Sequence, residues 1–136
     1  MDVTLSGTYV GKLKVAVEHG PSGALLHTAA PVDNRGDGSS FSPTDLTAAA
    51  LGACMLTIMG IVAERDGLDL DGCRFQLEKH MRSDPRRIGR VPITFHMPAG
   101  LDPTARKKLE RSALTCPVAN SLHPELEQDT RFLYPD

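Results

Sequence analysis

The sequence contains few aromatic residues and no tryptophan; aromatic side chains make up 4% of its 136 residues. Because aromatic rings usually contribute much of the packing in a core, this core must instead consist mainly of alanine, valine, leucine, isoleucine and methionine. Hydrophobic residues still account for 40% and charged residues for 24%, values typical of globular proteins. The chain should therefore fold. Oligomerisation is a further way for it to bury apolar surface.

The sequence also has no large excess of positive or negative charge. The formal net charge is −2 and the sequence pI is about 6.2, whereas proteins that bind nucleic acids or anionic membranes through electrostatics carry concentrated positive charge. We therefore expect no nucleic-acid partner. The N-terminal segment 1–5 has neither the basic nor the apolar region of a secretion signal, so we expect a cytoplasmic protein.

Neither a disulfide framework nor a zinc site is indicated. Three cysteines cannot all pair within one chain, and stable disulfides are rare in a reducing compartment. The five histidines show no metal-binding spacing, and no Cys-x2-Cys pair occurs. A cysteine–histidine hydrolase stays an open alternative, because such partners meet in space and not in sequence, but the sequence singles out no histidine for that role.

The length fits one domain, 1–136, and the first part of the chain predicts strands. Residues 3–17 are rich in β-branched side chains and partly alternate, 19–23 form a turn, and 24–29 can supply a third short strand. The polar segment 31–42 should be a loop. A β-meander followed by a loop is therefore predicted before the first helix.

Strong signals for a helix start occur at Ser42. Serine is a good N-cap, Pro43 suits the first helical position, and Asp45 favours the positive end of the helix dipole. Residues 46–63 contain no charged side chain, and a helix that is apolar on every side is either a membrane span or the central helix of a core. Its many Ala, Gly and Thr residues make it only weakly hydrophobic, and no aromatic belt flanks it. We therefore predict a buried central helix and no membrane partner.

A second sheet is predicted after this helix. Alternation in 73–82 predicts one strand, and 91–97 predicts its hairpin partner, with Pro92 at a sheet edge or at the start of the strand. The basic segment 83–90 connects the two strands. We interpret its charges as those of a solvated turn rather than a binding patch.

The last part of the chain predicts two helices and a strand. Asp102 followed by proline repeats the cap-and-proline pattern and starts a helix that continues to Ala113. A further helical turn is expected over 118–122, and 131–134 can form a last strand. The order β-β-β-α-β-β-α-α-β indicates an α+β fold.

Two of the three cysteines are candidates for chemistry. Cys116 lies at a predicted helix N-terminus, where unpaired N–H groups and the helix dipole should lower the pKa of the thiol and favour the reactive thiolate. Cys54 lies in the apolar helix, where a lone cysteine is more often a small buried side chain than a reactive one. Cys73 has no helix terminus and no motif beside it, so we interpret it as structural. A second thiol can resolve a sulfenic acid made by peroxide, provided that the fold joins the two.

Two motifs resemble those of a known family. Ser42-Pro-Thr-Asp-Leu46 with Ala48-Ala-Ala-Leu-Gly-Ala-Cys54, and later Cys116-Pro-Val-Ala-Asn-Ser-Leu122, resemble the OsmC/Ohr family of osmotically inducible and organic hydroperoxide resistance proteins. The resemblance extends over nearly the whole chain, because the meander, the central helix and the Cys-Pro-Val helix follow in the family's order. It implies an OsmC-like fold, an intertwined α+β homodimer in which antiparallel sheets wrap around long central helices and active sites lie at the subunit interface.

The resemblance also implies an activity, that of a cysteine-based hydroperoxide reductase, peroxiredoxin-like and part of an antioxidant stress response. In the family the cysteine of the central helix attacks the peroxide and the Cys-Pro-Val cysteine resolves the sulfenic acid; Cys54 and Cys116 match these roles. A dithiol, which is a dihydrolipoyl group in the organic hydroperoxide branch, then reduces the disulfide. The resemblance implies a small apolar peroxide as substrate and no bound metal or other cofactor.

The family also uses an arginine and a glutamate beside the reactive thiol. Arg35 resembles the arginine of the OsmC branch, and its guanidinium would stabilise a thiolate and orient the peroxide; a solvated loop arginine is the equal alternative. The glutamate is missing, because Thr44 occupies the matching position. Asp45 follows one residue later, which turns a helical side chain by about 100°, so we favour a helix-start acid over a catalytic substitute.

These observations leave three hypotheses. The first is an enzyme, a thiol-dependent peroxidase that uses Cys54 and Cys116. The second is a non-enzymatic or weakly active homodimer that senses redox state or binds a small ligand. The missing glutamate supports this second hypothesis, because without it the protein would turn peroxide over poorly. The third assigns both cysteines to the core alone. We favour the first.

Overall fold

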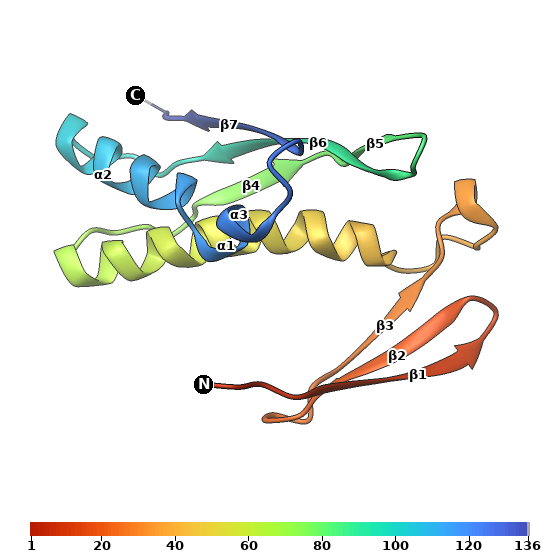
Figure 1. Ribbon diagram of the computed structural model, residues 1–136. Coiled ribbons are helices and arrows are strands. Elements are labelled where there is room, and N and C mark those ends of the chain that lie inside the picture. Colours follow the sequence, from red (N-terminus) through yellow and green to blue (C-terminus); the bar gives the residue numbers. More distant parts are fainter. Residues whose placement is uncertain (136) are drawn as a thin grey trace. The chain divides into compact units, whose positions relative to one another are not determined.

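The computed structural model describes residues 1–135, and the chain divides into two compact units, Met1–Thr47 and Ala48–Asp136. Each unit has its own sheet (Figure 1). The first unit contains β1 (Leu5–Gly11), β2 (Lys14–His19), β3 (Leu25–Ala29), the 3-10 turn η1 (Val32–Asn34) and the start of α1 (Pro43–Asp66). The second contains the rest of α1, β4 (Arg74–Leu77), β5 (His80–Arg82), β6 (Arg87–His96), α2 (Pro103–Leu114), α3 (Pro117–Ser121) and β7 (Glu127–Leu133). The single domain stays a prediction, whereas the α+β class is confirmed.

The first sheet is the predicted meander. Its three strands are antiparallel in the order β1-β2-β3, with Tyr9 opposite Val15 and Lys14 opposite Ala29. The β1–β2 turn places Lys12 and Leu13 at φ values of 55° and 61°, which is the left-handed geometry that tight hairpin turns require at both central residues. The strands predicted from the alternation in the sequence are therefore confirmed.

Helix α1 begins as predicted, with Ser42 as its cap. The Ser42 Oγ accepts a hydrogen bond from the Asp45 backbone N–H at 3.0 Å, and the Asp45 carboxylate accepts one from the Ser42 N–H at 2.9 Å. This reciprocal pair is a capping box, which satisfies two backbone donors that the helix itself cannot. The structural role assigned to Asp45, an acid of the helix start, is therefore confirmed.

The second sheet corrects several boundaries. The single strand predicted over 73–82 is two strands, β4 and β5, both antiparallel to β6. Glu78 and Lys79 lie between the two strands. The Glu78 N–H donates a hydrogen bond to the Pro92 carbonyl at 3.1 Å, and the regular pairing with β6 does not continue past Glu78. The β6 strand begins at Arg87, so the basic segment 83–90 is only partly a turn. Strand β7 begins before the predicted 131–134 and pairs with β6 in parallel.

The position predicted for Pro92 was wrong. Pro92 lies inside β6, which is the central strand of this sheet, and not at an edge or at the start of a strand. Its carbonyl faces the interruption between β4 and β5, where it accepts the hydrogen bond from Glu78. Because the N and C=O of one strand residue point to the same neighbour, the missing proline donor falls where the regular ladder is broken. A central strand can therefore hold this proline.

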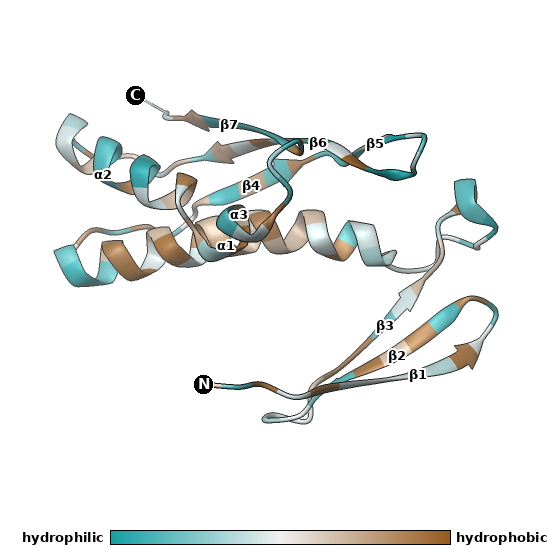
Figure 2. Ribbon diagram, viewed as in Figure 1, coloured by the Kyte–Doolittle hydropathy of each residue, from teal (hydrophilic) through white to brown (hydrophobic). Residues whose placement is uncertain are grey.

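Helix α1 runs along one face of the second sheet (Figure 1). Gly52 allows close approach, since a Cβ atom there would lie 2.6 Å from Phe75 Cε1. The core combines α1 with β6 and α2; its buried α1 members are Ala48, Leu51, Met55, Met59, Val62 and Ala63. Figure 2 shows white to brown colours along most of the helix, so its exposed side is apolar as well.

The length and hydropathy of α1 also satisfy a test for a membrane span, although 39% of the most apolar window is buried in the protein. Within the described chain it is the one helix that does so. A core helix passes the same test, and the six core members of α1 are what such a helix requires.

The two later helices follow the prediction. Asp102 caps α2 by accepting a hydrogen bond from the Ala105 N–H at 2.8 Å, and proline occupies the first turn. The chain leaves this helix at Thr115 and starts the short helix α3 at Pro117. This interruption positions Cys116 between the two helices.

Candidate functional site

The structure brings Cys54 and Cys116 together within the second unit. Cys54 lies in the middle of α1, and Cys116 is the residue that caps α3. Their side chains are hydrogen bonded to each other. Cys54 is half-buried against the core, whereas Cys116 is 0% exposed and belongs to the core itself. Two thiols in contact meet the geometric requirement that the sequence could not test.

Cys116 occupies a helix N-terminus, as predicted. Its backbone is extended, with φ −67° and ψ 155°, and Pro117 takes the first helical position. The Cys116 Sγ accepts a hydrogen bond from the Ala119 N–H at 3.3 Å. The sequence had given this location but not the particular N–H group, which follows from Cys116 being the N-cap and Ala119 the third helical residue.

The predicted lowering of the Cys116 pKa was wrong in direction. Burial raises the pKa of this thiol, because an apolar core disfavours the thiolate. The N–H groups of Ala119 and Val118 lower it, but they do not offset the burial together with the hydrogen bond and charge of Cys54. The surroundings therefore favour the protonated form of Cys116.

The raised pKa affects how Cys116 can act. The protonated form of Cys116 is favoured by burial and by its Cys54 neighbour. The thiolate is the reactive form of cysteine. The helix N-terminus therefore gives Cys116 no advantage as an attacking thiol.

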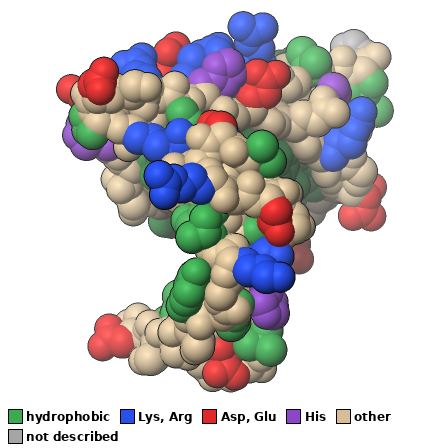
Figure 3. All heavy atoms as spheres, turned by 90° about the vertical axis from the view of Figure 1, so that its right-hand side faces the viewer, with side chains coloured by type: hydrophobic (Ala, Val, Ile, Leu, Met, Phe, Trp, Pro, Cys, Tyr) green, Lys and Arg blue, Asp and Glu red, His purple; other side chains and the backbone are tan. Residues whose placement is uncertain are grey.

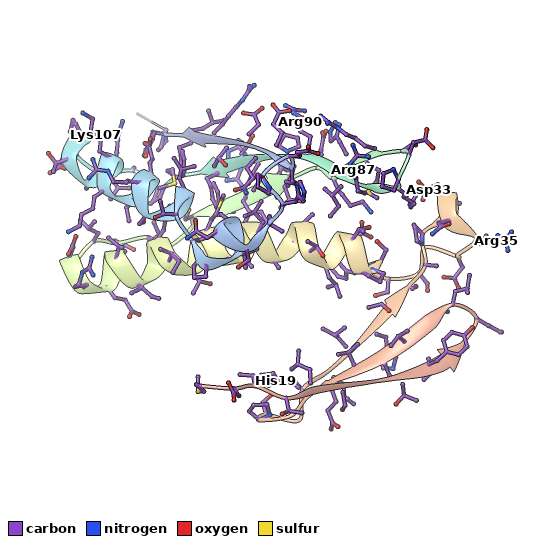
Figure 4. All side chains as sticks on the ribbon, viewed as in Figure 1. His19, Asp33, Arg35, Arg87, Arg90 and Lys107 are labelled. Atoms are coloured by element: carbon purple, nitrogen blue, oxygen red, sulfur yellow. The ribbon has the colours of Figure 1, made fainter. Side chains whose placement is uncertain are left out.

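Arg35 belongs to the first unit. It follows η1 with a left-handed φ of 68°, is exposed, and projects from its loop (Figure 4). In the described part of the chain its side chain forms no hydrogen bond or ion pair. The loop itself is held, because Lys14 Nζ lies 3.0 Å from Asp37 Oδ2 and the Gly36 N–H bonds the Pro31 carbonyl at 2.8 Å. Its approach to the cysteines stays a prediction.

Thr44 and Asp45 take part in the start of α1. The Thr44 hydroxyl lies 3.1 Å from the Ser42 hydroxyl, and Asp45 completes the capping box. Both side chains therefore have structural partners at the start of the helix. The catalytic role considered for Asp45 stays a prediction.

Cys73 lies directly before β4 and has a different environment from the other two cysteines. Its thiol donates to the Met97 sulfur at 3.7 Å, and burial raises its pKa. A protonated thiol against a thioether is unreactive, which agrees with the structural interpretation. Within residues 1–135, no three His, Cys, Asp or Glu side chains gather as a metal site would require.

Comparison with known proteins identifies the family. The model of the family described as OsmC-like protein matches residues 36–131. A solved structure from Psychrobacter arcticus 273-4, described as an osmotic stress induced and detoxification response protein, is 42% identical, with a TM-score of 0.92 over 96% of this chain and 95% of that one. Among curated proteins none matches the chain.

More distant structures share the fold. The organic hydroperoxide resistance protein OsmC of Legionella pneumophila is 20% identical, with a TM-score of 0.72 over 97% of this chain and 96% of its own. The organic hydroperoxide resistance protein OhrB of Bacillus subtilis is 16% identical, with a TM-score of 0.70 over 98% of each chain. Because the family match spans more than half of the sequence and the Psychrobacter protein is similar over nearly all of it, this chain belongs to the OsmC-like protein family.

Proposed function

We propose that this protein is a thiol-dependent peroxidase that reduces organic hydroperoxides through Cys54 and Cys116. The observation that carries the proposal is the hydrogen bond between the two side chains, which brings the two sulfurs together. Family membership supports a peroxide-related redox role, since similar structures include proteins named for organic hydroperoxide resistance.

The first step is the attack of the Cys54 thiolate on the outer oxygen of the peroxide. The O–O bond breaks, the remaining alkoxide takes up a proton and leaves as an alcohol, and Cys54 becomes a sulfenic acid. The hydrogen bond from Cys116 stabilises the thiolate before the attack. Arg35 is the proposed group that orients the peroxide.

The second step joins the two sulfurs. The Cys116 sulfur attacks the sulfenic sulfur of Cys54, the Cys116 proton goes to the departing hydroxyl, and water leaves as the disulfide forms. The two thiols have then supplied the two electrons that the peroxide gained. An external dithiol, for which a dihydrolipoyl group is the candidate, reduces the disulfide by thiol exchange. No resident cofactor enters this cycle.

We also propose that the protein acts as a homodimer. Between Ala50 and Ile61 the exposed side of α1 carries no charge, and its members recur at helical spacing: Ala50, Ala53, Thr57 and Ile61. In the first unit, the exposed large apolar side chains include Val3, Leu5, Tyr9, Val10, Leu13, Leu25 and Leu26. So much exposed apolar surface is unusual for a monomer and is typical of a protein interface. A second copy of the chain is the partner that the family resemblance implies.

The test is peroxide consumption by the purified protein. We expect catalytic turnover of cumene or tert-butyl hydroperoxide with dihydrolipoamide or dithiothreitol, and none for Cys54→Ser, because no other thiol can take the first step. Cys73→Ala is the matched control and should retain turnover, since Cys73 contacts Met97 and not the pair. Wild-type protein that consumes no peroxide with any dithiol yet binds a small apolar ligand would replace the enzyme with the binding or sensing protein.

A further inference from the structure

A small pocket lies between the β5–β6 hairpin and the segment that follows α3. Its volume is about 150 Å³. The hairpin contributes Arg82, Arg87, Ile88 and Gly89, and the segment after α3 contributes His123, Glu125 and Leu126. None of these residues has a part in the cysteine chemistry. Figure 3 looks from the hairpin end and shows Lys, Arg and His side chains in the upper part of the view, with Asp and Glu side chains between them.

Arg87 is held in place by the backbone of the hairpin turn. Its Nη1 donates to the Ser83 carbonyl at 3.0 Å and to the Pro85 carbonyl at 2.8 Å. These bonds leave the Nε and Nη2 donors of the guanidinium for other partners. A guanidinium that is already positioned loses less conformational entropy on binding an anion. Figure 4 labels Arg87 at this end of the sheet.

Arg82 lies across Gly89 of the neighbouring strand. A Cβ atom at Gly89 would come within 2.6 Å of the Arg82 Cδ and Nε atoms, so only glycine lets the arginine side chain lie flat there. Across residues 1–135 neither Arg82 nor Arg87 forms an ion pair with a carboxylate. Two positive charges therefore line one small pocket, and neither is in an ion pair with a described residue.

His123 adds a further donor. Its Nδ1 accepts the Glu125 backbone N–H at 3.0 Å, so the neutral ring carries its proton on Nε2. Glu125 supplies the single carboxylate of the lining, and two guanidinium groups outweigh it. The half-buried side chains Ile88 and Leu126 complete the wall, and such apolar surroundings strengthen a charge interaction relative to open water.

We propose that this pocket binds a compact oxyanion, a phosphate- or carboxylate-type group, between Arg82, Arg87 and His123. The fork of a guanidinium matches the oxygens of both groups, and a cavity of about 150 Å³ holds a molecule the size of benzene, which is enough for one such group. The basic segment 83–90, interpreted from the sequence as a solvated turn, is then part of a binding site.

The test is an NMR titration of the full chain with potassium phosphate, against potassium chloride at the same ionic strength. We expect saturable shifts of the Gly89 and Leu126 amide signals. Arg82→Gln should weaken phosphate binding about tenfold or more, and Gly89→Ala should do so with the charge unchanged, because its methyl group displaces the Arg82 side chain. Arg74→Gln, at an exposed arginine of β4 outside the pocket, is the matched control and should bind as the wild type does.

Amide shifts that do not saturate with phosphate would overturn the proposal, since they would report general charge screening. Shifts that decrease by the same amount in Arg82→Gln and Arg74→Gln, relative to the wild type, would overturn it for the same reason. The source of the oxyanion is distinguished by n-butyl phosphate. Tighter binding than inorganic phosphate identifies the head group of a larger molecule, and equal binding identifies a free anion. Cys54→Ser should bind phosphate with wild-type affinity, which separates this site from the peroxidase proposal.

Discussion

The side chains of Cys116 and Cys54 are hydrogen bonded to each other, although different helices position the two residues. Cys116 is the more deeply buried cysteine, and burial raises its pKa. The sequence alone favoured Cys116 as the more reactive thiol because of its helix N-terminus. The structure removes that advantage, since burial and the neighbouring Cys54 favour the protonated form of Cys116.

One equivalent of peroxide should produce a disulfide between Cys54 and Cys116. We expect intact-mass analysis to show a loss of about 2 Da, mapped by proteolysis to these two residues, because their sulfurs are already in contact. In Cys116→Ser the sulfenic acid has no resolving partner and should persist as a gain of about 16 Da on Cys54. Thiols that remain unmodified in the wild type would assign both cysteines to the core alone.

The free energy of unfolding should fall as the pH rises above the ordinary pKa of a thiol. The folded-state pKa of Cys116 is raised, so below about pH 8.5 both states keep the proton and stability is unaffected. Above that pH the unfolded chain ionises first, at about 1.4 kcal/mol per pH unit for one group, until the folded pKa is passed.

Urea denaturation at pH 7.5 and pH 9.5, under reducing conditions, measures this effect. Cys116→Ala should show a smaller difference between the two pH values than the wild type, even though the lost side chain lowers stability at both. Cys73→Ala should also reduce the difference, because burial raises the pKa of Cys73 as well. An unchanged pH dependence in Cys116→Ala would contradict the raised pKa.

The capping box predicts a stability cost without a loss of chemistry. Ser42→Ala should lower the free energy of unfolding by about 1 kcal/mol, because the Asp45 N–H loses its acceptor. Asp45→Asn should lower it by a similar or smaller amount and retain peroxide turnover per folded molecule. Ser6→Ala, at an exposed β1 position, is the control for chemical denaturation. Turnover lost in Asp45→Asn at unchanged stability would instead make Asp45 catalytic.

Alanine substitutions at two glycines of α1 should change the free energy of unfolding in opposite directions. Gly52→Ala forces a methyl group against Phe75 at 2.6 Å and should cost about 1–3 kcal/mol by overpacking. Gly60 has no heavy atom of the chain within 4 Å of an added Cβ, so Gly60→Ala should stabilise the helix by up to about 1 kcal/mol. Thermal and urea unfolding of both variants checks this. A destabilised Gly60→Ala would indicate that another chain packs there.

Sedimentation should give about twice the chain mass of 14.7 kDa, because the apolar side of α1 requires a cover. Ile61→Lys places a charge on that side, where Ile61 is 54% exposed, and should shift the protein toward the monomer. Leu114→Lys changes a similarly exposed residue of α2 and should leave the mass unchanged. A wild-type monomer at micromolar concentration would exclude the proposed dimer.

Local signals predicted most of the elements. The caps at Ser42 and Asp102 form as expected, because capping depends on residues three positions apart. The break at Glu78 and the central place of Pro92 were missed, since both depend on which strand lies opposite. A parallel partner such as β7 leaves no local signature, because its pairing with β6 joins segments far apart in the chain.

By itself the sequence determined where the helices begin, which segments alternate as strands, and which two cysteines resemble the pair of a family. Those features depend on neighbouring residues and on motifs. Only the tertiary structure decided that the two thiols interact, that burial raises the pKa of Cys116, and that Arg82 and Arg87 share a pocket with His123. Contact, burial and local dielectric depend on distant segments that meet in space, and they determine the pKa of a thiol more strongly here than its own helix terminus does.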